Sequence, residues 1–231
     1  MKTLSIDAVK TLSIDVVSDV VCPWCYVGKR RLEGALQLFA EKYPDITPQV
    51  RWHTFQLNPD LPSDGIDRAS YVANKFGERG ATVYERVAGV GREVGLSFAF
   101  DKIARQPNTL LAHSLIAVAE PAQLQERVVE GLFQAYFIDG QDLTQPHTLL
   151  QIATQAGMTE QLATDAIDDA ALHAQTQDAD QAAREMGISG VPFFIFNKHV
   201  GLSGAHESAT LLEGMEQALA QAFDPSAAGA E

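Results

Sequence analysis

The sequence contains very little cysteine and no long hydrophobic run: only 2 of its 231 residues are cysteine. A membrane-spanning helix needs about 20 mostly apolar residues, and no stretch approaches that length. The N-terminus begins with Met1, Lys2 and Thr3 and has no apolar segment of the kind found in a secretory signal peptide. We therefore expect a cytoplasmic protein. In that compartment a pair of cysteines is more often catalytic or redox-sensing than structural.

Basic residues are also scarce, with 17 Lys and Arg against 30 Asp and Glu, a formal net charge of −13 and a pI of about 4.8. Such a chain repels phosphate backbones, so we expect neither nucleic acid nor a membrane as a partner. Hydrophobic residues make up 46% of the chain, which is enough for a sizeable globular core.

Both cysteines lie in one motif, Cys22-Pro23-Trp24-Cys25. This spacing fits a redox pair, half of a metal site, or an inert buried pair. A zinc site needs four ligands at matching spacings. The chain has no second C-x-x-C, and no H-x3-5-H pair occurs among its six histidines, which are His53, His113, His147, His173, His199 and His206. We therefore favour the redox pair and expect no metal and no other cofactor, with the two remaining interpretations kept as alternatives.

The residues around the motif support redox chemistry. An apolar strand is predicted over residues 12–17, and helical periodicity runs from Pro23 to about Tyr43. A strand that leads through C-P-x-C into a helix is typical of thioredoxin-like proteins. Cys22 would then be the N-cap, where free backbone N–H groups and the helix dipole favour a thiolate, and Pro23 fits the first helical position.

Our hypothesis is that Cys22 is the exposed nucleophile and that Cys25, one turn into the helix, is the buried resolving thiol. Trp24 cannot supply the positive charge that a histidine would add beside the thiolate. We interpret Trp24 as an exposed aromatic side chain that helps to dock an apolar peptide or a partner protein.

A second element of the site is predicted at Val191-Pro192, which follows Gly187-Ile188-Ser189-Gly190. A proline at this point can simply mark the start of a strand. In a thioredoxin-like sheet, however, this position is the cis-proline loop that faces the cysteines. Given the C-x-x-C motif upstream, we expect a cis bond that presents the backbone of Val191 to an incoming peptide.

The remaining pattern predicts an α/β protein with a thioredoxin-like fold and a large all-helical insertion. The first part of the thioredoxin-like domain covers residues 10–62 and includes a second strand at 49–55. The insertion covers 63–184, and its last helix returns to the thioredoxin-like part. The second part, 185–223, contains a hairpin and a closing amphipathic helix. We expect Asn197-Lys198 to form the hairpin turn, although it lacks the glycine typical of such turns.

The N-terminus carries a duplication, because residues 2–9 are repeated as residues 10–17 with one difference, Ala8 against Val16. Only the second copy adjoins the cysteines, so it should be the buried strand. The first copy, residues 1–9, and the small, polar tail at 224–231 are expected to be disordered.

The run from Asp19 to Lys29 is similar to the active-site signature of the DsbA-family oxidoreductases of the FrnE type. The similarity extends over roughly residues 10–222. Its further motifs are residues 52–58 with Leu61-Pro62, residues 107–113, residues 135–137, and residues 187–196 with Gly204. The resemblance implies a thioredoxin fold with a helical insertion, and disulfide exchange through a mixed disulfide at Cys22. Some proteins of this type carry an additional cysteine pair, which this chain lacks.

The same superfamily contains 2-hydroxychromene-2-carboxylate isomerases and kappa-class glutathione transferases. In those enzymes a serine typically replaces the first cysteine, and a Ser-Asp pair holds the γ-glutamyl group of glutathione. Here the matching positions are Ala205 and His206, which argues against a glutathione-dependent isomerase or transferase. That activity and a redox-independent chaperone-like module remain the alternative functions.

We expect the partners to be protein or peptide thiols and disulfides and low-molecular-weight thiols such as glutathione, and the superfamily makes a homodimer conceivable. The resemblance also implies that the helix carrying Asn108 and His113 lines the cleft over the cysteines. The alternative, which we favour, is that Asn108 caps this helix and His113 is a hydrogen-bonded core histidine. Lys29, Arg30 and Arg31 are interpreted as a solvated face of the first helix.

Overall fold

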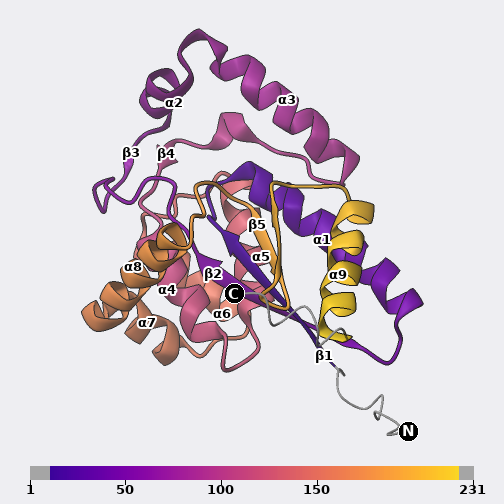
Figure 1. The fold of residues 1–231 in the computed structure, drawn as a ribbon. Coiled ribbons are helices and arrows are strands. Elements are labelled where there is room, and N and C mark those ends of the chain that lie inside the picture. The colour runs from indigo at the N-terminus through magenta and orange to yellow at the C-terminus, as the bar shows by residue number, and fades with distance from the viewer. Residues whose placement is uncertain (1–10, 224–231) are drawn as a thin grey trace, which may run out of the picture.

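The computed structural model describes residues 11–223, and its centre is a mixed four-stranded sheet in the order β2-β1-β5-β6 (Figure 1). β1 (Thr11–Ser18) pairs in parallel with β2 (Thr47–Thr54) and antiparallel with β5 (Phe193–Phe196), which in turn pairs antiparallel with β6 (Val200–Ser203). Along β1, alternate residues are fully buried, as a strand with one face on the core requires. The second copy of the duplicated segment therefore forms the central strand, as predicted.

The turn between β5 and β6 is formed by Asn197 and Lys198, whose φ angles are +48° and +64°. Two successive residues with positive φ match the right-handed twist of a hairpin, and asparagine tolerates this conformation better than most residues. The Asn197 side chain also holds the turn against β1, since its Oδ1 accepts a hydrogen bond of 3.0 Å from the backbone N–H of Ser13. The predicted hairpin is thus confirmed without glycine.

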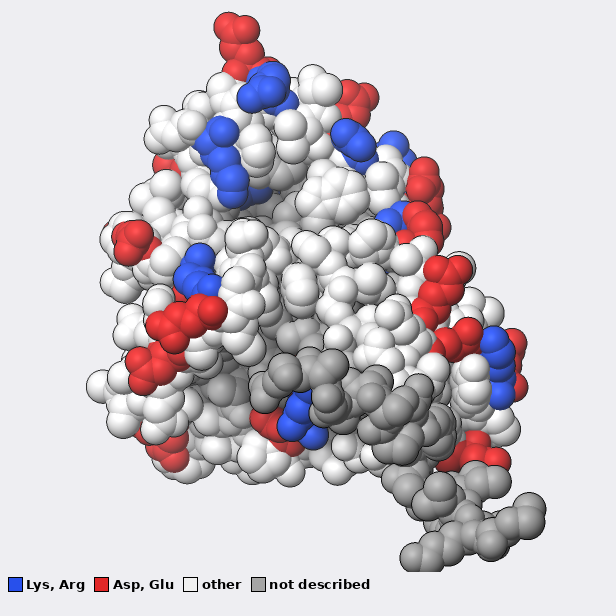
Figure 2. Space-filling view, in the orientation of Figure 1, with Lys and Arg blue, Asp and Glu red and all other residues white. Residues whose placement is uncertain are grey.

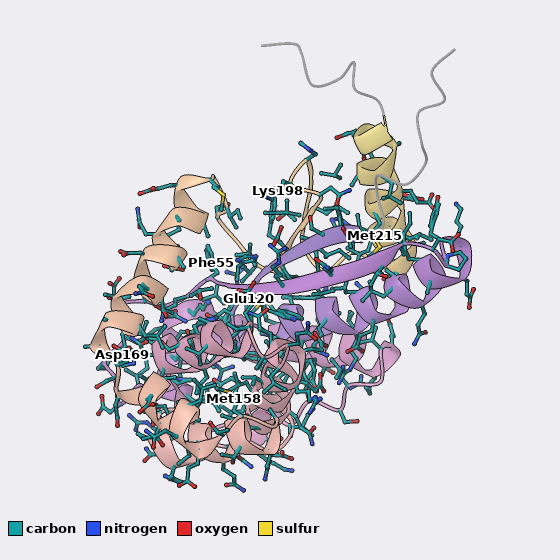
Figure 3. The ribbon with its side chains drawn as sticks, turned by 90° about the horizontal axis from the view of Figure 1, so that it is seen from below. Phe55, Glu120, Met158, Asp169, Lys198 and Met215 are labelled. Carbon is teal, nitrogen blue, oxygen red and sulfur yellow. The ribbon has the colours of Figure 1, made fainter. Side chains whose placement is uncertain are left out.

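Three long helices pack around the sheet. α1 (Pro23–Lys42) and α9 (Ser208–Phe223) pack against each other, and α8 (Ala170–Glu185) covers the end of β2. Phe55 lies between α8 and the strands (Figure 3), in a small apolar cluster that also contains Val17, Ala183 and Ile188. These β-α-β and β-β-α units join in one sheet and form the predicted thioredoxin-like α/β fold.

The segment between β2 and α8 forms two layers (Figure 1). The upper layer contains α2 and α3 and lies above the start of α1, whereas α4, α6 and α7 lie beside and below the sheet. The elements are β3 (Ile66–Asp67), α2 (Arg68–Phe76), α3 (Gly80–Glu93), β4 (Arg105–Gln106), α4 (Leu110–Ala119), α5 (Gln125–Phe137), α6 (Pro146–Gln155) and α7 (Glu160–Asp168), with short 3-10 turns at Gly77–Arg79 and Phe100–Lys102.

The insertion is joined to the thioredoxin-like part through aromatic packing. The ring of Tyr26 on α1 stacks on Phe133 of α5 with centroids 4.8 Å apart, and Phe137 lies one turn further along the same helix. All three side chains are almost fully buried. The two parts therefore share one hydrophobic core next to the cysteine-bearing end of α1.

The prediction of an all-helical insertion was wrong in one detail. Ile66 and Asp67 pair antiparallel with Gln106 and Arg105 in a small two-stranded sheet. Strands of two residues leave no alternating pattern in the sequence, so periodicity cannot reveal them. The first copy of the duplicated segment and the tail at 224–231 lie outside the described residues. Within residues 11–223, no helix combines the length and apolar character needed to cross a membrane.

Candidate active site

The two cysteines lie where β1 passes into α1. Cys22 is the N-cap of the helix with an extended backbone (φ −95°, ψ 109°), and Pro23 occupies the first helical position. The carbonyl of Cys22 accepts a hydrogen bond of 3.0 Å from the N–H of Cys25, which places Cys25 one turn into the helix. Both cysteines are free thiols. The predicted local geometry is therefore present.

The prediction that Cys22 is exposed was wrong. Cys22 is only 5% exposed and Cys25 only 1%. The loop that precedes β5 covers the first thiol, which lies 3.6 Å from the carbonyl oxygen of Val191. An N-cap position favours exposure only when nothing packs on the helix end. Here a segment about 170 residues away in the chain does so.

Burial raises the pKa of the Cys25 thiol well above its ordinary value, and the adjacent Cys22 sulfur raises it further. The backbone of Asp19 and the hydroxyl of Ser18 oppose this effect only in part. Cys25 is therefore protonated at neutral pH in the reduced protein. This protonation state suits a thiol that reacts second, after a disulfide has formed at its neighbour.

The Val191–Pro192 peptide bond is cis and directly precedes β5. Pro192 is buried, and its carbonyl accepts a hydrogen bond of 2.8 Å from the N–H of Gly204. The proline ring packs on Gly28 of α1, where an added Cβ would lie 2.9 Å from the proline Cγ. Glycine is thus required at position 28 for the close approach of helix and loop.

A buried carboxylate, which the sequence did not single out, holds the turn beneath the cysteines. Asp19 is fully buried and accepts hydrogen bonds from the backbone N–H of Leu57, at 2.7 Å, and of Val21, at 3.4 Å. Nε2 of His113 on α4 lies 3.4 Å from the same carboxylate. Asp19 therefore ties the end of β1 to the segment after β2 and to the helical insertion. The sequence feature that could have revealed this role is the presence of an acidic residue directly after an apolar strand.

His113, only 2% exposed, is thus a core histidine paired with an acid. Asn108 precedes α4 and accepts a hydrogen bond of 3.0 Å from the N–H of Leu110. Its amide also donates to the carbonyl oxygens of Pro59 and Leu61. The N-cap of α4 is Thr109, so the prediction that Asn108 caps the helix was wrong by one residue, although the Asn108 side chain still accepts from the first N–H of the helix. Both Asn108 and His113 fix α4 to neighbouring segments.

Trp24 is partly buried and packs against the hydrophobic core, so it is less free than the exposed aromatic side chain that we expected. The interpretation of the basic residues at 29–31 as a solvated face was also wrong. The side chain of Lys29 is only 3% exposed and pairs with Glu33 and Glu126, each at 2.5 Å, and with Glu130 at 2.8 Å. Arg31 is likewise buried and pairs with Glu207.

The described residues contain no group of three or more His, Cys, Asp and Glu side chains that could hold a metal ion. At the segment expected to face a glutathione γ-glutamyl group, the carbonyl of Ala205 accepts from Arg31, and the His206 ring lies 2.9 Å from the carbonyl oxygen of Ser203. The Ala205 methyl group offers no hydrogen bond to a ligand, and the His206 ring is engaged with nearby backbone. The polar chemistry of the site is therefore that of two thiols, a backbone carbonyl and a buried Asp–His pair.

Comparison with known proteins places these features in a family. The model of the DSBA-like thioredoxin domain matches residues 13–216. The uncharacterised protein YwbO of Bacillus subtilis is 26% identical over 191 residues, which cover 82% of this chain and 89% of that protein.

Among solved structures, a probable DsbA oxidoreductase from Streptomyces coelicolor superposes with a TM-score of 0.81 at 24% identity, covering 91% of each chain. The cytosolic disulfide reductase DsbM from Pseudomonas aeruginosa, solved with glutathione, has a TM-score of 0.60 at 17% identity, covering 91% of this chain and 96% of its own. A 2-hydroxychromene-2-carboxylate isomerase also has a TM-score of 0.60, at 14% identity, covering 95% of this chain and all of its own. At these identities the structural likenesses establish the fold.

Proposed function

This chain belongs to the family of proteins with a DSBA-like thioredoxin domain, and we propose that it is a thiol-disulfide oxidoreductase acting through Cys22 and Cys25. The observation that carries the proposal is the placement of the two thiols. Cys22 caps α1 opposite the Val191 carbonyl, and Cys25 is buried one turn behind it with a raised pKa. A substrate that displaces the Val191 contact would thus meet the Cys22 sulfur first, while Cys25 stays protonated behind it.

The reaction begins with Cys22 acting as a thiolate, because the thiolate and not the thiol attacks a disulfide. It attacks one sulfur of a substrate disulfide, so that the substrate S–S bond breaks and a mixed disulfide with Cys22 forms, releasing one substrate thiolate. Cys25 then loses its proton and attacks the Cys22 sulfur. This step releases the second substrate thiol and leaves a Cys22–Cys25 disulfide, so that two electrons have passed to the substrate.

The protein disulfide must be reduced again for a further cycle, and two molecules of a low-molecular-weight thiol such as glutathione would supply the two electrons. Similarity to a cytosolic disulfide reductase solved with glutathione supports this direction and a cytoplasmic location. The finer assignment to the FrnE type is part of the same proposal.

We further propose that protein or peptide substrates approach over the Val191 backbone. On the face shown in Figure 2 the charged side chains lie towards the rim, and the middle of the face is largely uncharged. This middle overlies β5, β6 and the loop that leads into them (Figure 1). An uncharged surface beside a backbone acceptor suits an extended apolar peptide better than a charged one.

The experiment that tests the function is capture of the mixed disulfide. The Cys25→Ser variant is incubated with a peptide disulfide and should accumulate a covalent adduct at Cys22, detected by mass spectrometry without reductant. Cys22→Ser is the matched control and should accumulate far less, because Cys25 is buried and protonated. Absence of an adduct in Cys25→Ser would sink the proposal. A glutathione-dependent isomerase activity that persists in this variant would favour the alternative function.

A further inference from the structure

One buried cation in the insertion has no acidic partner. Of the three basic side chains that are buried in residues 11–223, Lys29 pairs with three glutamates and Arg31 pairs with Glu207. Arg68, the first residue of α2, is 6% exposed, and none of the ion pairs in this part of the chain includes it. A buried charge without a counterion is strongly destabilising compared with a paired one. The burial of Arg68 without an acidic partner therefore needs an explanation.

The groups around the guanidinium of Arg68 solvate its charge without neutralising it. Its Nη2 donates to the hydroxyl of Tyr84 at 2.7 Å, and its Nη1 donates to Oε1 of Gln106. The rings of Tyr71 and Tyr84 lie 5.3 and 5.0 Å from its Cζ, within the range of a cation–π contact. Nε2 of Gln106 is itself buried without an acceptor in the described part of the chain. The guanidinium of Arg68 and the side-chain amide of Gln106 can therefore each donate a further hydrogen bond.

The acidic residue nearest in sequence is engaged elsewhere. Asp67 is the N-cap of α2, and its Oδ1 accepts from the backbone N–H of Ser70 at 2.7 Å and from the Ser70 hydroxyl at 2.8 Å. This capping geometry turns the carboxylate towards the first turn of the helix. Asp67 therefore stabilises α2 and leaves Arg68 without a counterion.

Arg68 lines a cavity of about 380 Å³ between α2, α3 and the turn at Phe100–Lys102. This volume lies within the range of small-molecule sites, roughly 300–1,000 Å³. Apart from Arg68 and the Tyr84 hydroxyl, the cavity is lined by glycine, alanine and larger apolar residues. The larger ones are Val72, Phe100 and Ile103. The cavity thus offers one positive charge at a wall that is otherwise apolar.

We propose that this cavity binds a small organic carboxylate with a compact apolar body, such as an aromatic acid. The carboxylate would accept hydrogen bonds from Arg68, whose planar guanidinium matches its two oxygens, and the apolar body would pack on Tyr84 and Phe100. The site lies in the layer above the start of α1 (Figure 1), and its residue Tyr84 is near enough to Cys22 for the two groups to interact electrostatically. Binding of the acid requires no redox step and does not depend on the proposed redox function.

Calorimetry with benzoate as the probe tests the assignment. Benzoate should bind the wild-type protein, whereas the neutral isostere benzamide and inorganic phosphate should bind much more weakly. Arg68→Met should weaken benzoate binding by about tenfold or more, the size expected for loss of a charge-assisted hydrogen bond. Arg127→Met, which removes an exposed arginine outside the cavity, is the matched control and should leave the affinity unchanged.

A second variant keeps the test valid if Arg68→Met does not fold. Ala73→Leu fills part of the cavity from α2 while leaving the guanidinium in place, and it should also weaken benzoate binding. Lack of benzoate binding to the wild-type protein would overturn the proposal. Equal affinity for benzoate and benzamide, or for benzoate and phosphate, would overturn it as well, as would unchanged benzoate binding in Ala73→Leu.

Discussion

The thiol of Cys22 lies 3.6 Å from the carbonyl oxygen of Val191, although the two residues are 169 positions apart in the chain. This contact joins the start of α1 to the loop before β5 and buries the thiol that would react first. A substrate that replaces the contact would find the sulfur and a backbone acceptor side by side. The close approach of the helix and the loop is therefore the main determinant of the geometry of the site.

Gly28→Ala tests whether that approach matters for reaction. The new Cβ would lie 2.9 Å from Cγ of Pro192, so the loop must move away from α1. Overpacking of this kind typically costs about 1–3 kcal/mol of stability. We expect slower mixed-disulfide formation at Cys22 in the folded variant, measured by stopped-flow mixing with a peptide disulfide.

The matched control is Gly89→Ala on α3, where the nearest atom to a new Cβ is 3.8 Å away. Removing a helical glycine there should add about 0.5–1 kcal/mol of stability and leave the exchange rate unchanged. An unaltered rate in Gly28→Ala would show that the position of the loop does not limit the reaction.

The raised pKa of Cys25 gives a second prediction. Burial is its main cause and the Cys22 sulfur the next. In Cys22→Ser the pKa of Cys25 should therefore fall only part of the way towards the ordinary value, as measured from thiolate absorbance against pH. Because the folded-state pKa is raised, the unfolded chain ionises first as pH increases, and the folded state loses stability above the ordinary thiol pKa. An ordinary Cys25 pKa in the variant would contradict the dominance of burial.

Asp15 lies on β1 and Asp19 lies just beyond its end. Replacing each by alanine compares the stability contributed by an exposed and by a buried carboxylate. Asp19→Ala leaves the N–H of Leu57 and the ring of His113 without their buried acceptor, and should cost about 2–4 kcal/mol. Asp15 pairs with the exposed His53 at 2.8 Å, and Asp15→Ala should cost less than about 1 kcal/mol. Urea unfolding at pH 7 distinguishes the two, and equal costs would rule out the anchoring role of Asp19.

Lys29 and Lys42 provide a similar comparison on α1. Lys29→Met leaves Glu33, Glu126 and Glu130 without the ammonium that joins them, and we expect a loss of about 1–3 kcal/mol, discounted because these carboxylates are partly solvated. Lys42 makes an exposed pair with Glu216, so Lys42→Met should cost clearly less stability than Lys29→Met. A larger loss in Lys42→Met would contradict this assignment.

Much of the fold could be predicted because local patterns agree with it. The apolar alternation of β1 and the run Phe193–Phe196 mark buried strands, and the order of Cys22 and Pro23 marks a helix start. The hairpin at Asn197 followed from turn residues alone. In each case the information lies within a few neighbouring residues.

The features that escaped prediction depend on contacts between distant segments. Lys29 is buried because Glu126 and Glu130 of α5 meet it, and no pattern within α1 reveals those partners. Cys22 is buried because the Val191 loop covers it. Arg68 is the first residue of a helix, and it is enclosed by Tyr84 of α3 and Gln106 of β4, which are distant in the chain. Such burial is a property of tertiary structure and is invisible to periodicity.

The most direct test of the redox proposal is the equilibrium between the dithiol and disulfide forms of Cys22 and Cys25 in a series of glutathione buffers. Thiol trapping followed by mass spectrometry reads the two forms. We predict a reversible two-electron transition, with a midpoint that gives the direction of exchange against a glutathione pool of known potential. A pair that stays reduced and unreactive across the whole series would contradict the assignment of this protein as a thiol-disulfide oxidoreductase.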